Sequence, residues 1–167
     1  TRLAFTVIDR VSETRAEVAG ELTAYAASDH LCYRAESPRA LVERQAREWG
    51  GVLDWAKAEH GLVFTPVGGI IHQPQPPATL AAVEALALTL DDFSLAGVAF
   101  AAGLYGSTVL ALAVRAGRLT GRKALDLSRL EETFQAEQWG EDAEATARVA
   151  FLAVEAEMID RWFAALR

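Results

Sequence analysis

The sequence has 167 residues, of which 51% are hydrophobic and 23% are charged, proportions typical of one globular domain with a substantial core. Its formal net charge of −7 argues against a nucleic-acid partner, because contacts with phosphates require a basic surface. Cys32 is the only cysteine, which excludes a disulfide framework within the chain and indicates a reducing compartment. No signal peptide is recognisable.

The first third of the sequence predicts two helices. Apolar residues recurring every three or four positions predict the first over residues 5–27. Its apolar stripe contains Val7, Ile8, Val11, Val18, Leu22 and Tyr25. A short extended piece follows at residues 31–34. Ser37 and Pro38 form a strong helix start, and we expect the second helix to run to about His60. Its inward face holds Leu41, Gln45, Trp49, Val52, Leu53 and Ala56.

The next stretch, up to residue 77, predicts extended backbone. Residues 62–66 and 70–71, joined across Gly68-Gly69, could form a short β-hairpin or an extended loop. The prolines of residues 72–77 exclude a helix interior there. A third helix is predicted directly afterwards, over residues 79–90.

The most hydrophobic stretch runs from Phe93 to Val114 and carries no charge. A helix that is apolar on every side must be buried, either in a protein core or in a bilayer. The run is long enough to cross a membrane, which would make the chain a membrane-associated helical protein. Charged residues on both flanks and the amphipathic character of the other segments favour a central helix buried in the core.

Two further helices complete the prediction. One is capped by Thr120 and runs to Trp139, and the last begins near Glu141 and ends near Leu166. The inner stripe expected for the last helix contains Phe151, Val154, Met158 and Trp162, supported by Leu152, Ile159 and Phe163. The sequence therefore predicts a mainly α fold in a single domain over residues 1–167. About six helices pack around a buried central helix (93–114), with at most a short β-hairpin near 62–71.

Motifs for nucleotides, metals and covalent catalysis are absent from the sequence. No Lys-Ser/Thr pair follows the glycines near residues 61–69, and no GxGxxG follows a strand. The three histidines, His30, His60 and His72, lack the spacing of metal ligands. A lone cysteine such as Cys32 is usually a small buried hydrophobe. We therefore expect no cofactor, no metal, no nucleotide and no catalytic residue.

The charges are concentrated between Glu131 and Asp160, where nine acidic residues accompany a single base, Arg148. This segment could be a solvated acidic face, or a docking surface for a basic partner. A third interpretation is a small helical enzyme or ligand-binding domain that uses carboxylates around Glu141. Trp139, followed by a glycine, could be an aromatic anchor at an interface or a core side chain that fills a helix–helix turn.

The run from Leu127 to Ala145, LSRLEETFQAEQWGEDAEA, resembles the signature of the F-type ATP synthase alpha-subunit assembly chaperones, the ATP-twelve family. Four further pieces fit the same pattern: Asp29 with Leu31–Ala35, Gln45 with Trp49 and Asp54-Trp55, Gly69-Ile70 with Gln73-Pro74, and Gly106-Ser107 leading into Leu110–Leu112. Together these pieces extend the similarity over most of the chain.

The resemblance implies a chaperone, not an enzyme, that binds the free alpha subunit of the synthase's catalytic head and shields its beta-facing surface. It also implies a bacterial cytoplasmic location, or the mitochondrial matrix for eukaryotic relatives, and a smaller β-rich N-terminal domain that this sequence lacks. The partner-binding residues that it marks are Gln135, Trp139, Gly140, Glu141, Asp142 and Glu144, with Asp29 and Arg34 as a second group.

Overall fold

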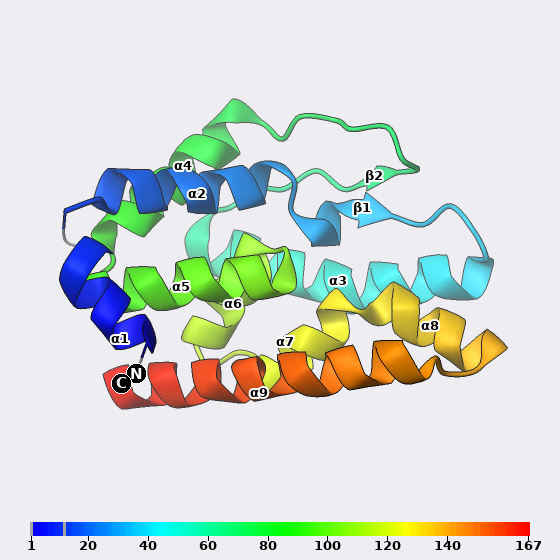
Figure 1. Cartoon of the computed structure of the whole chain (residues 1–167). Helices are drawn as coiled ribbons and strands as arrows, with labels where there is room; N and C mark the ends of the chain where they lie inside the picture. The colour runs from blue at the N-terminus through cyan, green and yellow to red at the C-terminus, as the bar shows by residue number, and fades with distance from the viewer. Residues whose placement is uncertain (1, 12) are drawn as a thin grey trace.

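The computed structural model describes residues 2–11 and 13–167, which form a helical bundle with one small sheet (Figure 1). The first elements are α1 (Arg2–Thr6), the π-helical turn η1 (Val7–Val11), α2 (Arg15–Ala27), the 3-10 turn η2 (His30–Cys32), β1 (Tyr33–Arg34) and α3 (Arg39–His60). The remaining elements are β2 (Val67–Gly68), α4 (Pro77–Thr89), α5 (Asp92–Tyr105), α6 (Thr108–Arg115), α7 (Gly121–Ser128), α8 (Leu130–Trp139) and α9 (Ala143–Leu166). The predicted mainly α fold class is confirmed, although several predicted helices are divided, so the described residues form nine.

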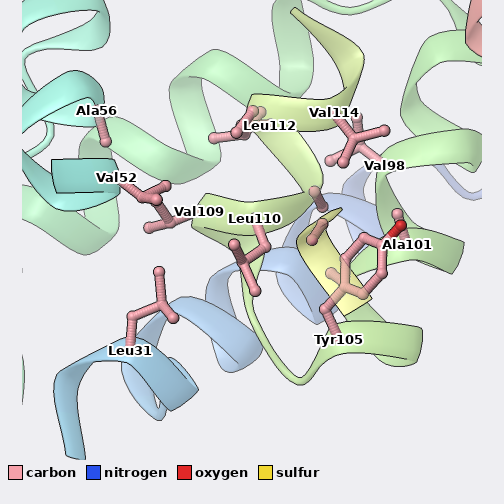
Figure 2. Packing of buried hydrophobic residues seen from close by; sticks show 14 of the residues in the cluster. Leu31, Val52, Ala56, Val98, Ala101, Tyr105, Val109, Leu110, Leu112 and Val114 are labelled. Atoms are coloured by element: carbon pink, nitrogen blue, oxygen red, sulfur yellow. The ribbon is translucent and has the colours of Figure 1, made fainter. Parts of the chain in front are cut away.

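The predicted central helix over residues 93–114 is two helices, α5 and α6. Gly106 ends α5 in the left-handed conformation (φ 64°), which glycine adopts without steric cost, and Ser107 caps α6 by accepting a hydrogen bond from the Leu110 amide. The predicted burial is confirmed for α6, since every residue from Ser107 to Val114 is buried, and only in part for α5, where Phe93 and Gly103 are exposed and Phe100 is half-buried. Figure 2 shows Val109 and Leu110 of α6 within the core. No helix in the described ranges is long and apolar enough to cross a membrane.

A buried carboxylate fastens this break to the N-terminal half of the chain. Asp29 is fully buried, and its two oxygens accept hydrogen bonds from the backbone amides of Leu31 and Val109, both at 3.1 Å. Burial raises the pKa of Asp29 to about 6, an effect that hydrogen bonds from Ser107 and the nearby amides oppose only in part. One side chain therefore joins the end of α2 to the start of α6.

The predicted inward face of α3 is confirmed in full. Its buried residues are Leu41, Gln45, Trp49, Val52, Leu53 and Ala56. The two polar members are satisfied across elements, since the Gln45 side-chain oxygen accepts from the Ala35 amide and the Trp49 indole donates to the Leu127 carbonyl, each at 2.8 Å. These bonds fix α3 against β1 and against the end of α7.

The predicted helix over residues 5–27 is wrong as a single element. Thr14 has non-helical backbone angles (φ −122°, ψ 28°), and α2 begins only at Arg15, whose guanidinium pairs with Asp92 and donates to the Leu88 carbonyl. This anchoring fixes where α2 starts relative to α4 and α5. In the predicted stripe, Val11 and Leu22 are buried, Val18 is half-buried and Tyr25 is exposed, while Val7 and Ile8 have side chains outside the described set.

Of the two alternatives for residues 62–71, the extended loop is confirmed for residues 62–66 and the short β-hairpin is wrong. The two strands are parallel, with Tyr33 opposite Val67 and Arg34 opposite Gly68, because α3 connects them as a crossover. The backbone of Thr65 forms hydrogen bonds with a side chain, not with a strand. The buried side-chain amide of Gln75 accepts one from the Thr65 N–H and donates one to the Thr65 carbonyl. Residues 62–66 are therefore extended but unpaired with a strand.

The C-terminal helices differ from the prediction in two ways. The helix expected from Thr120 to Trp139 is interrupted at Arg129 (φ −108°, ψ 20°), which separates α7 from α8. The inner stripe of α9 is displaced, since Phe151 and Val154 are 67% and 61% exposed. Met158 and Trp162 are half-buried, and the buried positions are Ala153, Ala156, Ile159 and Phe163.

A close approach between α7 and α9 explains the displaced stripe. A Cβ atom at Gly121 would lie 2.2 Å from the Ala156 carbonyl oxygen, and the Gly121 amide donates to the Asp160 carboxylate at 2.6 Å. Only small side chains fit at this crossing. Ala153 and Ala156 of α9 therefore face inward, and its larger residues Phe151 and Val154 face solvent.

We expect Gly121→Ala to lower the free energy of unfolding by about 3 kcal/mol, because the added methyl group must push two backbones apart. Gly20→Ala is the matched control: Gly20 lies in α2, and a Cβ atom there would meet no neighbouring atom within 4 Å, so its substitution should stabilise by about 0.5–1 kcal/mol. Urea unfolding followed by circular dichroism measures both. Equal effects of the two substitutions would contradict the close crossing.

The buried Asp29 carboxyl predicts a specific dependence of stability on pH. Because its pKa is raised on folding, the folded state gains stability from its protonation at low pH and loses that contribution as the pH rises from about 4 to about 6. The stability difference between the wild type and Asp29→Asn should therefore fall by about 3 kcal/mol over this window. Urea unfolding at pH 4, 5, 6 and 7 tests this, and parallel profiles for the two proteins would contradict it.

Candidate functional site

The residues of the signature occupy one exposed edge of the bundle, formed by α8, the following turn and the start of α9. At this edge α8 buries only Leu130, and residues 141–148 are exposed without exception. Figure 1 shows the turn between α8 and α9 at the end of the molecule opposite the two chain termini. We call residues 130–149 the α8–α9 edge.

The turn between the two helices is shaped by Gly140 and Asp142. Gly140 has a positive φ of 90°, which allows the chain to leave α8 in a direction that other residues disfavour. Asp142 is the N-cap of α9: its carboxylate accepts from the Glu144 amide at 3.2 Å, and its backbone carbonyl accepts from the Thr146 hydroxyl at 3.0 Å. Two signature residues thus have a structural role in presenting the others.

Trp139 does not fill the core at this turn. Its side chain is 88% exposed, at the last residue of α8. A large aromatic side chain held in water on a rigid helix is the residue type that contributes most to protein–protein interfaces. The interpretation of Trp139 as a core side chain that fills a helix–helix turn is therefore wrong.

Carboxylates surround this tryptophan. Glu132, Glu137, Glu141, Asp142 and Glu144 are all exposed, and only Glu137 forms an ion pair in the described part of the chain, with Arg44 of α3 at 3.0 Å. That pair ties α8 to the body of the bundle. The other four carboxylates remain available to a partner.

A shallow groove of about 550 Å³ lies between α7, α8 and the start of α9. Glu132, Glu137, Glu141 and Asp142 contribute to its walls, together with Arg122 and Arg129. Gln135 and Glu144 lie on the same edge outside this groove and are exposed. The described residues contain no cluster of three potential metal ligands. This arrangement suits contact with a surface.

The second predicted group, Asp29 and Arg34, lies away from this edge. Asp29 is buried with both oxygens occupied, which leaves it no surface for a partner. Arg34 is half-buried: its Nε donates to the Leu31 carbonyl at 2.8 Å and its guanidinium lies 5.8 Å from the centroid of the Trp49 ring. Burial lowers the pKa of Arg34 below its ordinary value.

Arg34 is connected through Trp49 to the end of α7, which precedes the α8–α9 edge. Arg34 covers Trp49, and the Trp49 indole donates to the Leu127 carbonyl just before α8 begins. The sequence analysis did not predict the Arg44–Glu137 ion pair or the exposure of Phe151. The spacing of Ala153 and Ala156 with Ile159 and Phe163 defines a buried face of α9 that leaves Phe151 outside.

The described site is an open, exposed edge of a helical bundle. In the comparison with protein families, the model described as ATP12 chaperone protein matches residues 1–57. The signature run lies outside that matched segment and inside the structural matches described next.

Three solved structures share the fold. Atp12 from Paracoccus denitrificans is 37% identical with a TM-score of 0.94, over 99% of this chain and 71% of that one. An aspartate-to-lysine mutant of the Paracoccus protein is 38% identical with a TM-score of 0.95, over 100% of this chain and 71% of that one. The Atu1473 protein from Agrobacterium tumefaciens is 36% identical with a TM-score of 0.92, over 99% of this chain and 62% of that one.

The chain belongs to the ATP12 chaperone family. The resemblance recognised in the sequence is thereby confirmed, and the class of the protein is that of a chaperone of ATP synthase assembly.

The cap role of Asp142 can be separated from its charge. Asp142→Ala should lower the free energy of unfolding by about 1 kcal/mol, because the Glu144 amide loses its acceptor. Asp142→Asn keeps a capping oxygen and should leave stability nearly unchanged. Thermal unfolding of both variants measures the difference, and equal stability of the two would show that the cap contributes nothing.

Proposed function

We propose that this chaperone binds the free alpha subunit of ATP synthase through the α8–α9 edge and shields the surface that alpha later presents to beta. The observation that carries the proposal is the 88% exposure of Trp139 on an edge where Glu132, Glu141 and Glu144 are also exposed and form no ion pair with another described residue. Membership of the ATP12 chaperone family supports an ATP synthase subunit as the partner. The proposed contact residues are Gln135, Trp139, Gly140, Glu141, Asp142 and Glu144.

The edge would act by complementarity. Carboxylates on an exposed rim steer a basic surface into contact and fix its orientation, while the indole of Trp139 excludes water at the centre. Phe151 and Val154 add exposed apolar area two to three turns further along α9. Release follows when beta covers more apolar area on alpha than the chaperone does. We place this exchange in the bacterial cytoplasm.

This mechanism uses no bond-making step. Glu141 and Glu144, the pair considered for acid–base catalysis, are exposed side chains at the start of a solvated helix. General acid–base chemistry needs a carboxyl group positioned against an enclosed substrate. The geometry therefore favours binding over the alternative of a small helical enzyme.

Charge reversal tests the edge without disturbing the cap. Glu141→Lys combined with Glu144→Lys leaves Asp142 in place and should weaken alpha binding by about tenfold or more at low salt. Glu59→Lys combined with Glu84→Lys makes the same change in net charge on exposed positions of α3 and α4, and should bind alpha normally. Titration of purified alpha subunit against each variant, with beta as the specificity control, gives the affinities. Normal binding by the edge variant would refute the interface.

Trp139→Ala tests the aromatic anchor separately. Because the side chain is exposed, its removal should leave the free energy of unfolding unchanged while costing about 2 kcal/mol of binding free energy for alpha. Trp55→Phe serves as a control for changes in tryptophan content away from the edge, on α3. Unaltered affinity of Trp139→Ala would remove the anchor from the proposal.

A further inference from the structure

The outer face of α9 carries an apolar stripe, and Figure 1 shows this helix along one boundary of the bundle. Phe151 and Val154 are exposed at the centre of the stripe, with Ala147 exposed before them and Met158 half-buried after them. These four residues, which we call the α9 stripe, follow one another in alternating steps of four and three. Two helices of a coiled coil pack through residues at this spacing, so the α9 stripe fits another helix.

Charged residues of opposite sign continue the same spacing at the two ends of the α9 stripe. Glu144 lies three residues before Ala147, and Arg161 lies three residues after Met158. Both charged side chains are exposed, and neither forms an ion pair with another described residue. This face of α9 therefore has an acidic N-terminal end, an apolar middle and a basic C-terminal end.

A second copy of α9 that lies antiparallel on this face is complementary to it. Phe151 of one copy lies opposite Val154 of the other beside a two-fold axis, and Glu144 lies opposite Arg161 at both ends. A parallel arrangement would instead set Glu144 against Glu144 and Arg161 against Arg161, and like charges in contact repel. The charge pattern thus favours a second copy of this chain as the partner and the antiparallel direction for it.

The charges beside the α9 stripe fit the same arrangement. A two-fold axis perpendicular to both helices brings the same flank of each copy together. On one flank, Arg148 of each copy lies near Glu155 of the other, and neither residue is ion-paired within the described chain. On the other flank, Glu157 faces the neutral Ala150. The Asp160 carboxylate is engaged with α7, where it accepts a hydrogen bond from a backbone amide. The pairing therefore opposes no like charges.

We propose that the free chain forms an antiparallel two-fold dimer through α9, with Phe151 and Val154 of both copies at its centre. A single pair of helices buries less than the roughly 1,200 Å² of a standard protein interface. We therefore expect a dissociation constant on the order of 100 μM and rapid exchange. One consequence rests on the proposed function: because Glu144 belongs to the proposed alpha contact, alpha and the second copy compete for the start of α9.

Charge reversal at either end of the α9 stripe tests the partner and its direction together. Glu144→Arg and Arg161→Glu each set like charges against one another in the dimer, so each variant alone should dimerise about tenfold more weakly than the wild type. An equimolar mixture of the two variants should regain dimerisation, because both ends of the mixed dimer again oppose unlike charges. Sedimentation velocity from about 10 μM to about 1 mM measures the dissociation constants.

Glu59→Arg on α3 is the matched control, since it changes the net charge by the same amount at an exposed position away from α9. Its mixture with Arg161→Glu carries the same net charges as the test mixture but should dimerise more weakly. A wild type that stays monomeric throughout the concentration range would overturn the inference, as would test and control mixtures that dimerise equally.

Phe151→Ser tests the apolar centre of the dimer. Because the side chain is exposed, thermal unfolding should be unchanged while the dimer weakens by about tenfold or more. Leu88→Ser removes an exposed leucine of α4 and should leave the dimer unaffected. Equal dimerisation of these two variants would overturn the inference.

The dimer and the proposed function fail separately. A wild type that dimerises without binding alpha refutes the function and supports the dimer, whereas one that binds alpha and never dimerises refutes the dimer alone. Adding purified alpha subunit to the dimer tests the competition. We expect a complex of alpha with one copy of the chain, and a complex of alpha with the intact dimer would contradict the competition.

Discussion

The hydrogen bonds of the buried Asp29 carboxylate hold the two halves of this fold together. This side chain links the turn after α2 to the first amides of α6, at the point where Gly106 and Ser107 break the apolar run. The break allows α6 to enter the core, where it packs against α2, α3 and α7. With α6 in the core, α5 can present one face to solvent between α2 and α9. Burial of the Asp29 carboxyl group, which raises its pKa, thus accompanies an arrangement in which α6 is buried and α5 is partly exposed.

The C-terminal half follows from a second constraint, the contact of Gly121 with the Ala156 carbonyl. Because α9 approaches α7 through small residues, its bulkier Phe151 and Val154 face solvent. Glu141 in the turn before α9 and Glu144 in its first turn are both exposed, close in sequence to Trp139. A rigid core and an exposed, charged edge are therefore produced by the same helix, which suits a protein that must hold a partner without enclosing it.

Much of this organisation was predictable from periodicity and capping. The inward face of α3, the burial of residues 107–114 and the clustering of the residues 135–144 on one edge all follow from residue spacing. The failures have local physical causes. The break at Gly106 depends on a left-handed residue and a cap that a continuous apolar pattern conceals. The parallel pairing of Tyr33 with Val67 depends on a long-range crossover. The predicted stripe of α9 placed Phe151 and Val154 inward, although the crossing with α7 at Gly121 admits only small side chains. Burial of Asp29 could not be read from its charge, since only the fold supplies its hydrogen-bond donors.

The central claim is that the α8–α9 edge contacts the alpha subunit. Hydrogen–deuterium exchange of this chain, alone and with a saturating amount of purified alpha subunit, tests it most directly, because the amides of an exposed helix end open readily without a partner. The account predicts slower exchange over residues 139–149 with alpha and no change with beta. Unchanged exchange over these residues in the presence of bound alpha, or equal protection by beta, would contradict the account.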